Sequence, residues 1–192
     1  MPSLSLQQWL TVRTAALDEI EGAHRHIGGT GPGRRYATQQ INQAYLVLLA
    51  SQFQGFCRNL HNECIDHLAR AMPSGELERT VYEEFRLHRR LGTGNPNPGN
   101  IGADYNRLGL VFWDVVDADH TRNRDRRAAL DALILWRNAI AHQDFDPTRL
   151  GGRTTVQLHE VRAWRSACDG LARSFDRVMG TYLHGVTGIA PW

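Results

Sequence analysis

Lysine is absent from the sequence: every one of the 22 basic residues is an arginine. A P-loop needs a lysine that reaches the bound phosphates, so the glycine-rich segment 28–33 predicts a loop and no nucleotide site of that type. Cysteine is also scarce. The three cysteines are odd in number and lie within helical patterns, which predicts buried thiols in a reducing compartment and no disulfide framework.

Long hydrophobic runs are missing as well. No stretch approaches about eighteen uninterrupted apolar residues, the length that indicates a membrane span, and segment 1–10 lacks the basic start and apolar run of a secretory signal. We therefore expect a cytoplasmic protein without membrane contact. A chain of 192 residues fits one domain and can bury a full core without disulfides or metal. We predict a single domain spanning 1–192.

A convincing metal-binding pattern is not present either. Histidines and cysteines recur between His24 and His67, but Cys57 and Cys64 also occupy an apolar helical stripe, where core packing explains them better than zinc. We predict no metal and no cofactor. The cysteines lack a convincing Cys-His nucleophile pattern and there is no Gly-x-Ser-x-Gly element, so acyl-transfer hydrolysis has little support.

What the sequence does contain is a helical period along most of its length, because apolar residues recur every three or four positions. The segment 108–116 fits a strand or a helix by pattern alone, but a lone strand would have no partner. We therefore predict an all-α bundle of five to six helices with one long early helix, whose core covers about 36–184. The predicted helices are 5–26, 36–72, 76–91, 108–116, 121–142 and a last one through Val161 to Tyr182.

Two further segments are interpreted from residues that cap or break helices. The segment 92–102 contains Asn95-Pro96-Asn97-Pro98-Gly99-Asn100, whose two prolines predict a non-helical loop long enough to carry function. Thr154-x-x-Gln157 resembles a capping box, so we expect it to start the last helix.

One helix carries a group of residues suited to chemistry. On the helix 121–142, an apolar face is predicted and Arg137 projects from its middle; the face consists of Leu130, Leu133, Ile134, Ile140 and Ala141. A buried, unpaired guanidinium is very costly. Arg137 must therefore meet a carboxylate, backbone carbonyls, or a polar cavity shared with another chain or a ligand. Asn138 and His142 are four residues apart and share one flank of the same helix.

The pattern Arg137-Asn138-x-x-x-His142 resembles the Arg-polar-x-x-x-His signature of the HEPN superfamily (higher eukaryotes and prokaryotes nucleotide-binding). In that family the motif lies near the C-terminal end of a late helix, after a long early one, as it does here. Residues 45–60 also look like the early helix of bacterial HEPN proteins of the RiboL-PSP type. The resemblance covers roughly residues 36–182 and implies a HEPN-like helical bundle.

The resemblance implies a homodimer that brings two motifs into one cleft and cleaves RNA without metal. Attack of a ribose 2′-hydroxyl on the adjacent phosphate needs proton transfer and stabilisation of negative charge. His142 would exchange the proton, Arg137 would hold the phosphate and Asn138 would orient the reacting groups. Asp144 is a candidate for orienting His142. Some relatives carry an acidic residue in the early helix, and the corresponding stretch of this chain has Gln54. Gln54 is therefore a candidate supporting residue.

The implied biological role is that of a toxin or phage-defence effector, with a cognate antitoxin or defence-system protein as a possible partner. HEPN toxins that are silenced by nucleotidyl transfer carry a tyrosine two residues after the histidine, whereas this chain has Asp144. Control by that chemistry is therefore not expected. The alternative is a non-catalytic HEPN module that binds RNA, a nucleotide or a partner protein.

Arginine is well suited to RNA, because its planar guanidinium binds phosphates in a bidentate way and stacks on bases. A bias in genomic composition is nevertheless the better explanation for the lack of lysine, and an arginine cluster is more often a solvated face than a binding patch. Two clusters are candidate RNA contacts: Arg86, Arg89 and Arg90, and Arg122, Arg124, Arg126 and Arg127.

Overall fold

The computed structural model describes residues 1–28, 35–72 and 75–192, and these ranges contain helices and no strand. The predicted all-α class is therefore confirmed. Most of the predicted glycine-rich loop, residues 29–33, and the predicted helix break at Pro73 and Ser74 lie outside the described residues. No helix in the described ranges has the length and apolar character needed to cross a membrane.

The N-terminal helix is continuous, as predicted for 5–26, and contains one π-helical turn. It consists of α1 (Leu4–Gln8), the turn η1 (Trp9–Arg13) and α2 (Thr14–Gly28). Ser3 caps its start by accepting a hydrogen bond from the Leu6 N–H. The fully buried Trp9 lies in the π-helical turn and donates from Nε1 to Asp169 Oδ1 at 2.9 Å, which attaches this helix to the rest of the bundle.

Two long helices form the centre of the molecule. Helix α3 (Arg35–Arg70) agrees with the prediction for 36–72, and α9 (Leu158–Thr187) agrees with the predicted last helix. The start of α9 differs from the prediction, because its capping box pairs Gln157 with Glu160 and does not use Thr154. Glu160 lies at the third helical position and accepts from the Gln157 N–H at 2.8 Å, which fixes that register.

Several shorter helices follow α3 and correct the predictions for this region. Helix α4 (Gly75–Arg86) ends earlier than the predicted residue 91, since His88 adopts a left-handed conformation with φ of 57°. Helices α5 (Arg90–Thr93) and α6 (Pro98–Asn106) occupy much of the segment predicted to be non-helical. The prediction of five to six helices is too low for this reason.

Helix α6 forms although it contains a proline, because Pro98 occupies the first helical position, where no N–H is required. Asn97 caps this helix by accepting from the Asn100 N–H at 2.7 Å. Helix α7 (Phe112–Asp119) confirms a helix in place of a strand but starts later than the predicted residue 108. Gly109 explains the shift, since its φ of 100° is left-handed and interrupts a helix there.

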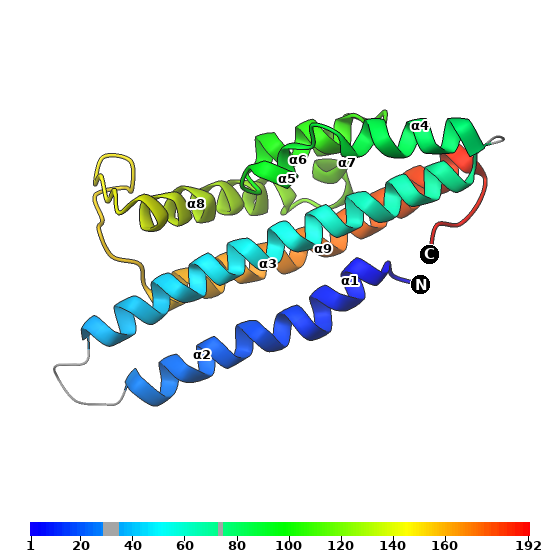
Figure 1. The fold of residues 1–192 in the computed structure, drawn as a ribbon. Coiled ribbons are helices and arrows are strands. Elements are labelled where there is room, and N and C mark those ends of the chain that lie inside the picture. Colours follow the sequence, from blue (N-terminus) through cyan, green and yellow to red (C-terminus); the bar gives the residue numbers. More distant parts are fainter. Residues whose placement is uncertain (29–34, 73–74) are drawn as a thin grey trace.

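The helices pack in three layers (Figure 1). Helices α1 and α2 lie on one side of the central pair α3 and α9, while α4 to α7 and α8 (Asn123–His142) lie on the other. The layers enclose a core of fully buried aromatic rings from four helices. These rings belong to Phe53, Phe56, Tyr105, Phe112 and Phe175, with centroids 4.3 to 6.4 Å apart in the contacting pairs.

A polar cluster around Glu21 joins α2 to the central pair. Its carboxylate accepts hydrogen bonds from Tyr45 of α3, at 3.1 Å, and from Arg162 of α9, at 2.7 and 3.0 Å. Burial alone would raise the pKa of Glu21, but the hydrogen bonds from Arg25, Arg162 and Tyr45 outweigh it and lower that pKa from 4.5 to about 2. This pairing allows a carboxylate to lie between helices.

Candidate active site

The last turns of α8 carry the predicted catalytic residues Arg137, Asn138 and His142. Gln143 adopts the left-handed conformation, with φ of 54°, and ends the helix directly after His142. The Asp144 N–H then closes the helix end by donating to the Ala139 carbonyl at 2.9 Å. As a result the His142 side chain is exposed, while Arg137, one and a half turns earlier, is half-buried.

The buried face of α8 differs in part from the predicted one. Leu130, Leu133 and Ile134 are buried as predicted, but Trp136 and Ala139 complete the face. Ile140 is half-buried and Ala141 is exposed, contrary to the prediction that both belong to the core side. Arg137 therefore lies at the edge of the buried face and not in its middle.

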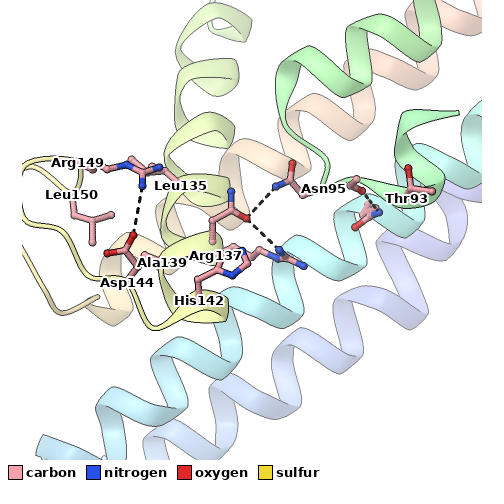
Figure 2. A pocket seen from close by; sticks show the side chains of 12 residues that line it. Thr93, Asn95, Leu135, Arg137, Ala139, His142, Asp144, Arg149 and Leu150 are labelled. Atoms are coloured by element: carbon pink, nitrogen blue, oxygen red, sulfur yellow. Dashed lines mark hydrogen bonds and ion pairs between the residues drawn. The ribbon is translucent and has the colours of Figure 1, made fainter. Parts of the chain in front are cut away.

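A cavity of about 500 Å³ lies beside this helix end (Figure 2). Its walls come from α3, from the turn after α5, from α8 and from the loop that follows α8. The lining residues are Gln54, Thr93, Gly94, Asn95, Leu135, Arg137, Asn138, Ala139, His142, Asp144, Arg149 and Leu150. Five of the predicted site residues therefore surround one space: Arg137, Asn138, His142, Gln54 and Asp144.

Arg137 and Asn138 contact each other directly. The Arg137 guanidinium donates from Nη1 to Asn138 Oδ1 at 3.2 Å. Within the described part of the chain, this is the hydrogen bond that Arg137 makes, and no carboxylate pairs with it. Of the three environments predicted for Arg137, the described residues supply a polar cavity; that this cavity is shared with another chain or a ligand stays a prediction. Its remaining N–H donors are available to an anion.

Gln54 supports the cavity wall by hydrogen bonds to backbone. Its Nε2 donates to the carbonyl of Leu91 at 3.0 Å and to the carbonyl of Gly94 at 2.6 Å. These two bonds attach α5 and the following turn to the middle of α3. A Cβ atom on Gly94 would lie 2.8 Å from Asn100 Nδ2 and 3.0 Å from the Arg90 carbonyl, so only glycine fits this turn without displacement.

Asp144 lines the cavity but pairs with Arg149 and not with His142. The Asp144 and Arg149 side chains form an ion pair at 3.7 Å, and both are more than half exposed. His142 makes no hydrogen bond with any described residue. The predicted orienting contact between Asp144 and His142 is therefore not formed in this chain. The two residues lie at the same cavity, as Figure 2 shows.

Sequence reasoning missed Asn95. Its Nδ2 donates to Asn138 Oδ1 at 3.1 Å, so this oxygen accepts from Asn95 and Arg137 together. The segment 92–102 was predicted to be a non-helical loop because of its prolines and to be long enough to carry function, but it is an asparagine of this segment that makes the contact. The repeat of Asn95, Asn97 and Asn100 was the signal that could have indicated this, since asparagine side chains bind both backbone and neighbouring amides.

The candidate RNA-binding cluster of Arg122, Arg124, Arg126 and Arg127 lies at the end of α8 remote from the cavity and is partly neutralised. Asp117 pairs with Arg127 at 3.2 Å and with Arg124 at 3.9 Å. Arg126 donates to Asn123 Oδ1 at 2.8 Å and lies over Gly170. Arg122 is exposed and forms no ion pair with a described residue. Of these four arginines, Arg122 is therefore the one that is exposed and has no acidic partner among the described residues.

The candidate RNA-binding cluster of Arg86, Arg89 and Arg90 lies just before and at the start of α5. Arg86 pairs with Asp66 at 3.5 Å and lies over the Tyr82 ring. Arg89 is half-buried and donates to Asn62 Oδ1 at 2.5 Å. Arg90 is exposed, and no acidic side chain of the described residues pairs with it. Arg90 is therefore the most accessible member, three residues before the cavity wall begins at Thr93.

Three of the residues set aside for metal binding belong to the core. Cys57, Cys64 and His61 are all fully buried, and burial raises the pKa of both thiols well above the ordinary value. His61 Nε2 lies 3.1 Å from the Asp104 carbonyl oxygen and must donate to it, since a carbonyl only accepts. Core packing of the two cysteines is confirmed. In the described ranges no three His, Cys, Asp or Glu residues are grouped as metal ligands.

Burial also perturbs His61. It lowers the pKa of this imidazole from 6.5 to about 4, against the opposing effect of the hydrogen bond to the Asp104 carbonyl. The positive charge of Arg89 lowers the pKa further. His61 Nδ1 is buried without a hydrogen-bond partner. The residue is therefore a neutral core histidine at neutral pH.

Comparisons with models of known protein families, with curated proteins and with solved structures find no match to this chain. The cavity at the end of α8, with Arg137, Asn138 and His142 in its wall, is therefore the observation from which a function has to be argued.

Proposed function

We propose that this protein is a metal-independent endoribonuclease of the HEPN type that acts as a homodimer. The observation that carries the proposal is that Arg137, Asn138 and His142 line one polar cavity. Arginine and the asparagine amide supply N–H donors for a phosphate, and an imidazole exchanges protons near neutral pH. Cleavage of RNA by its own 2′-hydroxyl needs these two functions and no protein nucleophile.

In the proposed reaction, the 2′-hydroxyl oxygen attacks the adjacent phosphorus, and the bond from phosphorus to the 5′-oxygen breaks. The products are a 2′,3′-cyclic phosphate and a 5′-hydroxyl. His142 is exposed at the helix end, where an RNA strand reaches it, and takes or returns a proton. Arg137 stabilises the charge that develops on the phosphate. A second copy of His142, from the other protomer of the dimer, would serve the opposite proton transfer.

The dimer is supported by the surface next to the motif. Ile140 is half-buried and Ala141 is exposed, so apolar side chains remain accessible at the end of α8. Together with Val47 and Leu48 of α3, Ile140 borders a shallow groove. Covering this surface with a second chain would bury it and bring two cavities together about a two-fold axis. The proposed role in the cell is that of a toxin or phage-defence effector.

The experiment is cleavage of a labelled RNA in excess EDTA by the purified protein and by folded variants. Arg137→Ala and His142→Ala are expected to be inactive, and Asn138→Ala is expected to retain part of the activity because it removes no charge and no proton carrier. Products ending in a cyclic phosphate identify the transesterification. RNA that stays intact with the parent protein contradicts the proposal.

One observation favours a second function, which is binding without catalysis by a HEPN module. His142 has no orienting hydrogen bond from a described residue, whereas Arg137 and Asn138 are connected and ready to hold an anion. A protein of this kind would bind RNA, a nucleotide or an acidic partner protein at the same cavity. It would retain RNA in a binding assay without shortening it.

A further inference from the structure

A chain of asparagine side chains connects the start of α6 to the cavity. Each member donates to the next, and the last acceptor is an amide in the cavity wall. The bonds run from the Asn100 N–H to Asn97 Oδ1 at 2.7 Å, from Asn97 Nδ2 to Asn95 Oδ1 at 2.8 Å, and from Asn95 Nδ2 to Asn138 Oδ1 at 3.1 Å. We call this chain the asparagine relay.

The direction of the relay is dictated at both of its ends. The backbone N–H of Asn100 only donates, so the atom of Asn97 that it meets has to be the oxygen. Asn97 is left with its NH₂ towards Asn95, and Asn95 in turn has its NH₂ towards Asn138. At the other end, the Arg137 guanidinium also only donates, and it meets the same Asn138 oxygen at 3.2 Å.

These two constraints determine what Asn138 presents to the cavity. Its oxygen is occupied by two donors, and its Nδ2 makes no hydrogen bond with a described residue. A rotated amide would place NH₂ against the NH₂ of Asn95 and against the guanidinium of Arg137, and it would leave both donors unsatisfied. The NH₂ of Asn138 is therefore the group available to a molecule in the cavity, next to the free donors of Arg137.

We infer that Asn95 and Asn97 are positioning residues that hold the Asn138 amide with its NH₂ towards the cavity, so that Arg137 and Asn138 together present only donors to a phosphate group. The relay explains why a helix cap and an active-site wall share the segment 95–100. The inference deepens the proposed function and rests on it for the identity of the phosphate as part of RNA. The preference of Arg137 and Asn138 for an anion follows from the two hydrogen bonds that occupy the Asn138 oxygen.

A double-mutant cycle tests whether Asn95 acts through Asn138. Inorganic phosphate is titrated into the protein, and its dissociation constant is measured from the NMR signals of the cavity residues, including the side-chain NH₂ of Asn138. We expect Asn95→Ala to weaken phosphate binding about ten-fold, or about 1.4 kcal/mol. In the Asn138→Ala background the same change is expected to have less than about a two-fold effect. Asn106→Ala, at the other end of α6, is the control.

A second variant separates the relay from the cap. Aspartate caps helices as well as asparagine does, so Asn97→Asp keeps the start of α6 but removes the donor that Asn95 needs. The relay predicts weaker phosphate binding, whereas a purely structural role of Asn97 predicts no loss of affinity beyond the effect of the new negative charge. The new negative charge would act in either background, so the Asn138→Ala cycle is repeated with this variant. Only the part of the loss that disappears in that background belongs to the relay.

The outcomes separate this inference from the proposed function. Additive effects of Asn95→Ala and Asn138→Ala, an unchanged affinity in Asn95→Ala, or a parent protein that binds no phosphate would each overturn the inference. A parent that cleaves no RNA, but whose phosphate affinity follows the cycle, contradicts the nuclease and leaves the relay standing. A parent that cleaves RNA, while the effects of the two substitutions on phosphate affinity are additive, supports the nuclease and overturns the relay.

Discussion

Mild acid is expected to destabilise this protein through His61. The imidazole is fully buried, and its pKa of about 4 lies below the ordinary 6.5 of an unfolded chain. Between these two values the unfolded state binds a proton that the folded state does not bind, so folding stability falls as the pH decreases from 6.5 towards 4. Above pH 6.5 the residue is neutral in both states and contributes no pH dependence.

The size of the effect follows from the pKa difference. Each pH unit below 6.5 costs about 1.4 kcal/mol until the folded pKa is reached, so at pH 5 the loss is about 2 kcal/mol. His61→Gln is the matched variant, because its amide can still donate to the Asp104 carbonyl but does not titrate. Urea unfolding at about pH 7.5 and pH 5 is expected to show that the parent loses about 2 kcal/mol more than this variant.

Equal losses in the parent and in His61→Gln would refute the reasoning, because the titration of His61 would then not be coupled to folding. If His61→Gln does not fold, NMR of the parent gives the same information. The ring signals of His61 are expected to stay in the neutral form from pH 7.5 to 5. A His61 that takes up its proton near pH 6.5 contradicts the burial argument.

The remaining predictions concern the cavity and the arginines. Gln54→Ala removes two hydrogen bonds to the turn after α5 and is expected to cost about 1 to 3 kcal/mol in urea unfolding, whereas an unchanged stability would mean that the turn is held elsewhere. Gly94→Ala crowds Asn100 and is expected to lower the rate of RNA cleavage while the protein stays folded, which paired activity and unfolding measurements check. Arg90→Gln is expected to reduce the slope of RNA affinity against salt by about 0.7 to 0.9 for one lost phosphate contact. Arg127→Gln, whose charge is paired with Asp117, serves as its control and is expected to leave that slope unchanged.

Much of the fold could be predicted from sequence because long helices have an apolar period. Helices α3, α8 and α9 repeat apolar residues every three or four positions over many turns, so their existence and approximate ends follow from spacing alone. The segment 92–102 could not be predicted in this way. Its proline at 98 terminates a helix in most positions but starts one when an asparagine caps it, and the sequence does not reveal which applies.

The candidate site also contains residues that could be predicted from the sequence and one that could not. Arg137, Asn138 and His142 are close in sequence, so helical geometry alone predicts that they lie near one another. Asn95 is 43 positions away from Asn138, and the two residues meet because Gln54 attaches the turn after α5 to α3 and because Asn97 and Asn100 hold Asn95 in place. A contact of this kind depends on tertiary packing, to which the spacing of residues within one helix gives no access.

Cleavage of RNA by His142→Ala is the measurement that tests the central claim most directly. His142 is exposed at the end of α8 and contributes little packing, so its loss is expected to leave folding intact. His184→Ala, which removes another exposed histidine in the last turn of a helix, is the matched control. In excess EDTA, His142→Ala is expected to cleave labelled RNA about a hundred- to ten-thousand-fold more slowly than the parent, while His184→Ala cleaves at the parental rate. Cleavage by folded His142→Ala as fast as by the parent would contradict the catalytic role of this motif and leave the cavity as a binding site.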